Sequence, residues 1–183
     1  TLPQVNTIAD GTAVKRPGEK LFPYIQENVD EIITIDDNEL IVAFLDMVEN
    51  HKMIVENSGL LTVAALKHIK AEKKKVVSIL SGGNMDVITL SSIVQHGLIQ
   101  RDRVFTVSVL LPDKPGELAR VSSLLAEQHG NIIKLEHNQF ISINRNAAVE
   151  LRITMEAFGT EHKNQIVTAL TDAGYRPKLV KVK

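Results

Sequence analysis

A four-residue segment, Ser81-Gly82-Gly83-Asn84, combines residue types that could bind a small polar molecule. It lies between an apolar run and a stretch that favours a helix. The start of a helix presents backbone N–H groups without a partner inside the helix, and such groups bind anions and polar rings. Two glycines in succession also let the backbone approach a ligand closely. Glycine pairs are also common in turns with a purely structural role, so this segment alone does not establish a site.

Two other segments could contribute to the same site. Asp10-Gly11 lies near the start of the sequence, and Glu56-Asn57-Ser58-Gly59 follows an apolar stretch. Each alone is weaker evidence than the glycine pair, because short acidic and glycine-containing turns are frequent in loops. Their combination and order carry more information than any one of them.

The sequence predicts no metal site. It contains no cysteine, which excludes disulfides and thiolate ligands. None of the six histidines lies two to four residues from another, and no carboxylate completes a metal-ligand pattern with them.

Charge and hydropathy exclude further classes of function. The 183 residues include 21 basic and 22 acidic side chains, so no field of one sign would attract nucleic acid or an anionic membrane. The basic run Lys73-Lys74-Lys75 is typical of a solvated approach to a buried strand. No apolar run approaches the ~20 residues needed to span a bilayer. Without cysteine or a secretion signal, the expected location is the cytoplasm.

The first hundred residues predict alternating strands and helices. Apolar runs at 31–35 and 76–80 are expected to be strands, and the second is continuous, as buried parallel strands tend to be. Helices are expected over 18–28, from Glu39 to about Asn50 with Asp36 and Asp37 as candidate caps, from Ser58 to about 68, and over 86–96 with Gly97 as the stop. This alternation is typical of an α/β layer, and its parallel sheet should need more strands than the chain supplies.

After residue 100 the pattern changes to that of a small antiparallel sheet. Strands are expected over 104–111, 133–141, 149–155 and 175–180, helices over 117–129 and 160–173, and turns at 112–116 and 144–146. This βαββαβ order is ferredoxin-like. We therefore expect two domains, residues 1–100 and 101–183.

The segments of the first domain resemble the second half of the fold-type II pyridoxal phosphate enzymes, especially the threonine ammonia-lyases (threonine dehydratases). The resemblance rests on Thr7-Ile8-Ala9-Asp10-Gly11-Thr12-Ala13-Val14, Val29-Asp30-Glu31-Ile32, Val55-Glu56-Asn57-Ser58-Gly59 and Leu80-Ser81-Gly82-Gly83-Asn84. Asn57 departs from the pattern, which more often has glycine, proline or alanine there. The resemblance implies the carboxy-terminal portion of a parallel-sheet, tryptophan-synthase-β-like catalytic domain.

The same resemblance implies a role for each residue of these segments. Gly11 would lie against the cofactor pyridoxal 5'-phosphate, and Glu56 near its pyridine ring. The Ser81 hydroxyl would donate to the pyridine nitrogen without protonating it, which favours expulsion of a β-hydroxyl. The remaining residues of this pocket would be Gly82, Gly83 and Asn84. The family's Schiff-base lysine, in a Ser-x-Lys-x-Arg-Gly context, and its phosphate loop do not occur here. We therefore expect no catalytic residue in this chain, a missing amino-terminal half, and no activity of the chain alone.

The second domain resembles the ACT family over residues 104 to about 181. The segment Leu111-Pro112-Asp113-Lys114-Pro115-Gly116-Glu117-Leu118 matches that family's first strand-to-helix turn. Its free N–H groups would bind an α-carboxylate. The resemblance implies an amino-acid effector, isoleucine or valine, and a homo-oligomer formed through this domain. The implied effector-binding residues are Asp113, Gly116, Glu117, Leu118, Asn131 and Ile132.

Together these resemblances imply a lyase that converts L-threonine, and more slowly L-serine, to 2-oxobutanoate or pyruvate and ammonia, under allosteric control. Such an enzyme belongs to amino-acid metabolism, for example to isoleucine biosynthesis. Two alternatives stay open. One is a stand-alone amino-acid-sensing module that dimerises through its sheet, and the other is a serine racemase-like enzyme.

Overall fold

The computed structural model describes residues 1–138 and 149–180. The chain forms two compact units, Thr1–Gly97 and Leu98–Lys183, which we call unit 1 and unit 2. Within the described ranges, no helix has both the length and the apolar character needed to cross a membrane.

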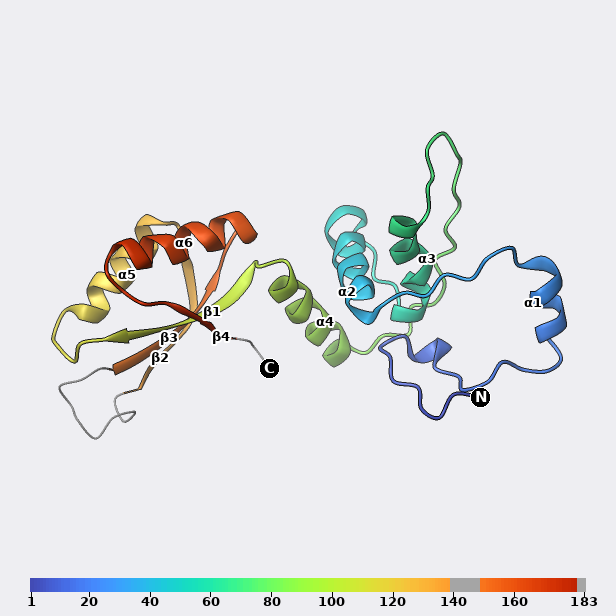
Figure 1. Cartoon of the computed structure of the whole chain (residues 1–183), viewed down its shortest axis with the longest axis horizontal. Helices are drawn as coiled ribbons and strands as arrows, with labels where there is room; N and C mark the ends of the chain where they lie inside the picture. Colours follow the sequence, from blue (N-terminus) through green and yellow to red (C-terminus); the bar gives the residue numbers. More distant parts are fainter. Residues whose placement is uncertain (139–148, 181–183) are drawn as a thin grey trace. The chain divides into compact units, whose positions relative to one another are not determined.

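Unit 1 consists of short helices joined by irregular segments, and its described residues form no strand (Figure 1). The end of α4, from Leu98 onward, belongs to unit 2. The helical elements are η1 (Asp10–Thr12), α1 (Phe22–Asn28), α2 (Asp37–Asp46), the π-helical turn η2 (Met47–His51), η3 (Asn57–Leu60), α3 (Leu61–Ala64), η4 (Ala65–His68) and α4 (Val87–Gln100).

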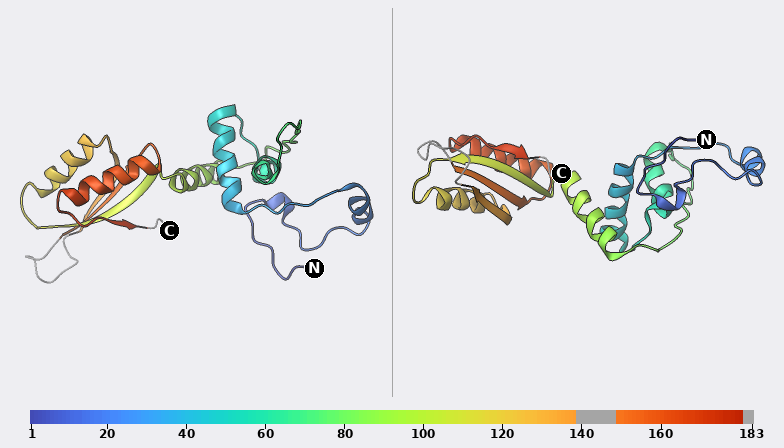
Figure 2. Two further views of the ribbon diagram at one scale, coloured as in Figure 1. Left: turned by 45° about the horizontal axis from the view of Figure 1, so that its top comes forward. Right: turned by 90° about the horizontal axis from the view of Figure 1, so that it is seen from below.

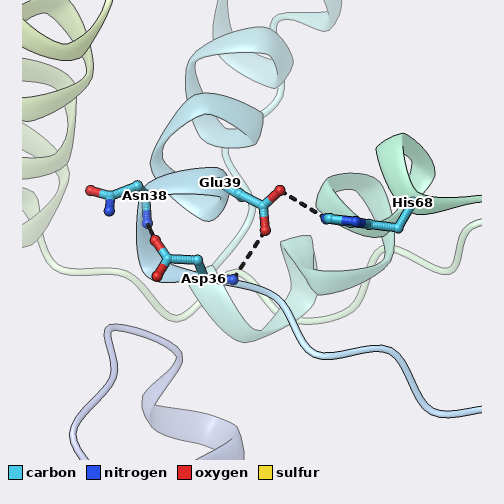
Figure 3. Close-up of polar contacts among 4 residues, drawn as sticks. All are labelled: Asp36, Asn38, Glu39 and His68. Carbon is cyan, nitrogen blue, oxygen red and sulfur yellow. Dashed lines mark hydrogen bonds and ion pairs between the residues drawn. The ribbon is translucent and has the colours of Figure 1, made fainter.

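A capping box fixes the start of α2 (Figure 3). The Asp36 carboxylate accepts from the Asn38 N–H at 2.8 Å, and Glu39 Oε2 accepts from the Asp36 N–H at 3.1 Å. The other Glu39 oxygen lies 2.8 Å from His68 Nε2, which joins α2 to η4. The hydrogen bond from the Asp36 backbone, followed by the one with His68, holds the pKa of the Glu39 carboxyl below its ordinary value.

The core of unit 1 lies where α2 meets η3, α3 and α4. Leu40, Phe44 and Leu60 are almost fully buried there. Gly97 lies against α2, because a Cβ at this position would come within 2.5 Å of Leu45 Cδ1. The prediction that Gly97 ends its helix is therefore wrong. Because Gly97 has no side chain, α2 can pack closely against it, and α4 continues to Gln100.

The two predicted strands at 31–35 and 76–80 are not strands. Neither segment pairs with a neighbour among the described residues. Several of their apolar side chains are exposed, with Val77 at 87%, Ile32 at 76% and Ile79 at 72%. A strand exists through hydrogen bonds to an adjacent strand, and this part of the chain supplies none. The predicted helix from Ser58 is likewise broken into η3, α3 and η4.

Unit 2 is a four-stranded antiparallel sheet in the order β2-β3-β1-β4, with α5 and α6 on one face (Figures 1 and 2). Its elements are β1 (Val104–Leu111), α5 (Glu117–Glu127), β2 (Asn131–Asn138), β3 (Val149–Glu156), α6 (Thr160–Asp172) and β4 (Lys178–Val180). Val107 of the central strand β1 faces Ile153 on one side and Leu179 on the other. The predicted ferredoxin-like arrangement is confirmed.

The two faces of this sheet differ in chemistry. Every second residue of β1 and β3 is buried against the helices, as alternation along a strand requires. On the opposite face, the Ser108 hydroxyl donates to Glu150 at 2.6 Å, and Arg152 Nε lies 3.1 Å from the same carboxylate. The Ser108 hydroxyl, and then Arg152, lower the pKa of Glu150.

Three predicted boundaries in unit 2 are wrong by two residues or more, and one of them is the start of β4, which lies at Lys178 rather than at 175. Helix α5 ends at Glu127, two residues early, because the chain turns at His129, whose φ is +58°. Strand β2 begins at Asn131 rather than at 133. The predicted end of that strand at 141 and the turn at 144–146 lie outside the described residues.

Candidate functional site

Three segments of unit 1 meet around Glu56. The Asn84 N–H donates to Glu56 Oε2 at 3.2 Å, and the Glu56 N–H donates to the Gly82 carbonyl at 3.4 Å. A Cβ at Gly82 would lie 2.0 Å from Glu56 Cδ, and the φ of +80° at Gly82 also favours glycine. On another side, a Cβ at Gly11 would lie 3.8 Å from Glu56 Oε1. Glu56 therefore lies between the segments that contain Gly11 and Gly82.

The backbone at Gly59 packs directly on Ser81. A Cβ at Gly59 would lie 1.7 Å from the Ser81 carbonyl oxygen, and one at Gly11 would lie 2.7 Å from Ser58 Oγ. Gly83 differs, because an added Cβ there would meet nothing within 4 Å. We call the group that these contacts bring together the glycine cradle: Gly11, Glu56, Ser58, Gly59, Ser81 and Gly82.

Two side chains hold the segment that leads to Gly11. Asp37, in the first turn of α2, accepts from Thr7 Oγ1 at 2.5 Å and from the Ile8 N–H at 3.2 Å. Asn57, at the start of η3, donates through Nδ2 to the Ile8 carbonyl at 3.0 Å. The capping box that fixes α2 thus also fixes the carboxylate that holds this segment.

A pocket of about 520 Å³ opens beside the cradle, a size suited to a small molecule. Three carboxylates line it, those of Asp10, Glu56 and Asp86, and none of the described residues around it is a lysine, an arginine or a histidine. Asp86 caps α4 by accepting from the N–H groups of Ile88 and Thr89 at 2.9 and 3.0 Å. The Thr89 hydroxyl is the main cause that lowers the pKa of the Asp86 carboxyl.

Two buried polar atoms at this place, Asn57 Oδ1 and Ser58 Oγ, have no hydrogen-bond partner among the described residues. An unsatisfied buried polar atom costs about 1–3 kcal/mol, so a partner from water, a ligand or another part of the protein would be favourable here. A pocket of this size, the open space at Gly83 and the unpaired polar atoms fit a small polar cofactor such as pyridoxal phosphate. The described residues contain no cluster of three or more His, Cys, Asp or Glu side chains that could hold a metal.

In unit 2, the predicted effector-binding residues lie at opposite ends of α5. Gly116 and Glu117 begin the helix, whereas Asn131 and Ile132 follow it. The 11 residues of α5 rise about 1.5 Å each, which separates its ends by roughly 16 Å. One bound amino acid therefore does not reach both groups within a single chain.

The start of α5 offers open space. Gly116 has a φ of +92°, and an added Cβ there would meet nothing within 4 Å. Asp113 is exposed, and Leu118 is 40% exposed. The Glu117 carboxylate accepts from the Tyr175 hydroxyl at 3.4 Å.

At the other end of α5 the candidate side chains already have partners within unit 2. Asn131 Nδ2 donates to Glu156 Oε2 at 2.7 Å, and Ile132 packs against the core of unit 2. Either the Asn131 amide keeps this bond when a ligand binds, or the ligand replaces it.

The sequence did not identify every residue of the cradle's surroundings. Asp37 was interpreted only as a helix cap, and Thr7 and Ser58 only as members of the motif segments. The available signal was Asn57, a polar residue where the family pattern has a small or apolar one. In the structure the Asn57 side chain connects the motif segment of Gly11 to the motif segment of Glu56.

Comparison with known proteins matches two parts of the chain to two different families. Residues 1–82 match the family of pyridoxal-phosphate dependent enzymes, and residues 105–174 match the ACT domain. An L-threonine ammonia-lyase of Geobacter sulfurreducens is 35% identical over 182 residues, which are 98% of this chain and 45% of that enzyme. An L-threonine ammonia-lyase of Thermotoga maritima is 30% identical over 175 residues, which are 95% of this chain and 44% of that enzyme. The chain thus spans less than half the length of these relatives. The first part of the chain thus matches the pyridoxal-phosphate dependent enzymes, the second part matches the ACT domain, and the chain as a whole matches the carboxy-terminal part of the threonine ammonia-lyases.

Proposed function

We propose that this chain is part of a cytoplasmic enzyme that uses pyridoxal 5'-phosphate to convert L-threonine, and more slowly L-serine, to a 2-oxo acid and ammonia. The observation that supports this most is the meeting of Gly11, Glu56 and Gly82 in one glycine cradle. These residues come from three motif segments that are far apart in the sequence. The 35% identity to an L-threonine ammonia-lyase points to the same activity.

The residues of the cradle suit this cofactor. Gly83 would leave room for the ring, whereas Gly11 and Gly82 let the backbone pack closely against Ser58 and Glu56. Glu56, with Asn84 donating to it, would lie near the ring substituents. When bound, pyridoxal phosphate withdraws electrons from the α-carbon of an amino acid. The Ser81 hydroxyl would donate to the pyridine nitrogen and leave it unprotonated, which weakens this withdrawal. A weaker withdrawal favours prompt loss of the β-hydroxyl over a long-lived carbanion.

The lysine that binds the cofactor covalently would come from an amino-terminal part of the protein. Lys15, Lys20, Lys52 and Lys67 are all exposed, and none has the Ser-x-Lys-x-Arg-Gly context. The phosphate-binding loop would come from the same amino-terminal part. No residue of this chain is therefore assigned a catalytic role.

The test compares the chain with the full-length protein that contains it. The full-length protein should show the absorbance of lysine-bound cofactor and should release 2-oxobutanoate from threonine. The chain alone should show neither. A full-length protein without threonine deamination would reject the proposal, and turnover by the chain alone would reject the assignment of the lysine to another part. Measuring racemisation of L-serine in the same samples distinguishes a serine racemase-like enzyme.

We further propose that unit 2 regulates this activity by binding an amino acid, isoleucine or valine, between two copies of the chain. The support is the position of the candidate residues at both ends of α5. A second copy could bring its Asn131 and Ile132 to the Asp113–Leu118 turn of the first. A ligand that binds one arrangement of the copies better than another shifts the equilibrium between them, and with it the activity.

A second candidate function is an amino-acid-sensing module that works without catalysis. The ACT domain matched in unit 2, with a core that lies wholly within that unit, favours it. Pyridoxal phosphate distinguishes the two functions. The full-length protein would bind it if the protein is an enzyme, and would not bind it if the protein is only a sensing module.

A further inference from the structure

Asn57 is one of two polar residues that the structure buries among the described residues, with 6% of its surface exposed. It lies between Glu56 and Ser58, two members of the glycine cradle. Burying an amide costs free energy unless it is hydrogen-bonded, so a buried asparagine at this place needs a reason. A glycine or an alanine at this position would carry no such cost.

The side chain of Asn57 holds one side of a peptide segment whose other side is held by Asp37. The Ile8 carbonyl accepts from Asn57 Nδ2 at 3.0 Å, and the Ile8 N–H donates to Asp37 Oδ2 at 3.2 Å. Both backbone polar groups of Ile8 are thus satisfied by side chains from different elements. The Ile8 residue cannot shift without breaking at least one of these bonds.

This attachment determines where Gly11 lies. Ala9, the next residue, is 2% exposed, and its carbonyl accepts from the Thr12 N–H at 3.0 Å in the turn η1. Gly11 lies in this turn, with its missing Cβ 2.7 Å from Ser58 Oγ. The bond from Asn57 to Ile8 therefore joins the turn that carries Gly11 to the segment that carries Glu56 and Ser58.

We propose that Asn57 is a positioning residue of the cofactor site, which sets the separation between Gly11 and the Glu56–Ser58 segment. This inference rests on the proposed function for its consequence, but its structural part concerns this chain alone. Asn57 Nδ2 makes the connecting bond. Asn57 Oδ1 is shielded from solvent and has no partner among the described residues, and Asn57 is one of the residues that line the pocket beside the cradle. The Nδ2 bond to Ile8 also fixes the orientation of the amide, and with it the position of Oδ1.

The structural part is tested by hydrogen exchange on this chain without cofactor. In Asn57→Ala, the amides of residues 8–13 should exchange about tenfold faster, the ratio that corresponds to losing about 1.4 kcal/mol of local stabilisation. The amides of α4 in the same molecule serve as the internal reference. The matched control is Asn28→Ala, because Asn28 Nδ2 also donates to a backbone carbonyl, that of Tyr24, at 2.9 Å on the surface of α1. The control should leave residues 8–13 unchanged.

Each outcome decides the proposal. Faster exchange confined to residues 8–13 supports it. An equal increase in residues 8–13 and in α4 would mean that Asn57 contributes only general stability, and would overturn it. Unchanged exchange in residues 8–13 would overturn it as well.

The functional part is tested in the full-length protein by cofactor binding and by the absorbance and fluorescence of the bound cofactor. Asn57→Ala should weaken pyridoxal phosphate binding about tenfold and shift the absorbance maximum. Asn57→Asp should be more severe, because a carboxylate oxygen would replace the Nδ2 donor opposite the Ile8 carbonyl. Wild-type affinity and spectrum in both variants would overturn the role at the cofactor site. If the wild-type protein itself bound no cofactor, the proposed function would fail and this role with it, whereas the hydrogen-exchange result would stand.

Discussion

Single residues of the glycine cradle contribute through the side chains they lack. A Cβ at Gly59 would lie 1.7 Å from the Ser81 carbonyl oxygen, and one at Gly82 would lie 2.0 Å from Glu56 Cδ. The two positions differ in what they touch. Glu56 is a flexible side chain that can move aside, whereas the Ser81 carbonyl is backbone and cannot move without displacing residues 81–82.

We therefore expect Gly59→Ala to destabilise unit 1 by about 2 kcal/mol, as overpacking of a closed interior does. The matched control is Gly18→Ala, since an added Cβ at Gly18 meets nothing within 4 Å. The control should change the free energy of unfolding by less than about 0.5 kcal/mol. Urea denaturation followed by circular dichroism measures both. Equal, small changes in the two variants would contradict the contact between η3 and Ser81.

In unit 2 the informative residue is Gly116, whose φ of +92° lies in the region that favours glycine. A branched side chain would strain this backbone, so Gly116→Asn is the better variant, because asparagine tolerates left-handed conformations. Its side chain would enter the open space in front of α5, and we expect the affinity for the effector to fall at least about tenfold, or 1.4 kcal/mol. Calorimetry with isoleucine, valine, threonine and serine measures the affinity. Equal binding to wild type and variant would place the site elsewhere. If the wild type bound none of the four amino acids, self-association would be the remaining role of unit 2.

The residues of the cradle could be predicted from the sequence as far as they lie in local motifs. Gly11, Glu56, Ser81 and Gly82 belong to short segments whose order is informative without any structure. The role of Asn57 could not be predicted, because its partner Ile8 lies 49 residues away. No local pattern indicates which carbonyl a buried amide will meet.

At the scale of elements, α6 begins with a cap that comes from outside the helix. Gly159, at its N-cap position, offers no side chain. Asp102, which precedes β1, accepts from Thr160 Oγ1 at 2.8 Å, and its other oxygen lies 2.8 Å from Lys163 Nζ. Lys163 and then Thr160 lower the pKa of the Asp102 carboxyl. A negative charge is favourable at this end of a helix, because the helix dipole is positive there.

The depressed pKa predicts how stability depends on pH. The contribution of the Asp102 charge is complete above the unfolded value of about 3.9 and is lost as the pH falls through the lower folded value. Asp102→Asn removes the charge but suits the φ of +55° at this position. At pH 7 we expect it to cost about 1 kcal/mol of unfolding free energy, and at pH 2 clearly less, because the charge is lost as the pH falls.

Thermal or urea unfolding of wild type and Asp102→Asn at both pH values measures this effect. Lys163→Gln should cause a similar loss at pH 7, and the double variant should lose little more than either single variant. A loss of the same size at pH 2 would mean that the charge is not responsible.

The elements of unit 2 could be predicted almost completely, because every strand of its sheet lies within the chain. Alternation in β1 and β3 and the periodic apolar residues of α5 point to the same fold. In unit 1 the segments at 31–35 and 76–80 carry the same kind of apolar pattern but have no strand beside them. Sequence patterns report which side chains a segment would bury, whereas a strand also requires a neighbour.

At the scale of the whole molecule, each unit has its own hydrophobic core, and among the described residues no strand pairs with the outer edge of β2. This strand runs over eight residues, and Ile133 and Leu135 on it are 52% and 36% exposed. Unpaired edges of this length are usually covered or joined to another copy. We therefore expect the chain to self-associate through β2.

Ile133→Lys should shift the chain toward the monomer, because an edge lysine opposes strand pairing. Thr168→Lys, on the exposed surface of α6, is the matched control for the added charge and should leave the association unchanged. Sedimentation velocity over a range of concentrations measures the outcome. A wild-type chain that stays monomeric, or an equal response of the two variants, would rule out association through β2.

The exposed apolar run at Val76–Ile79 also affects how long the protein should persist in the cell. Val77 and Ile79 present 87% and 72% of their surfaces to solvent. Chaperones and proteases sort chains continuously by how much is unfolded, and large exposed apolar surfaces invite aggregation. We expect chaperones and proteases to recognise this run in any copy of the chain in which other protein surface does not cover it. The rate of degradation in the cell should therefore be higher for a chain with these residues exposed than for a chain with these residues covered.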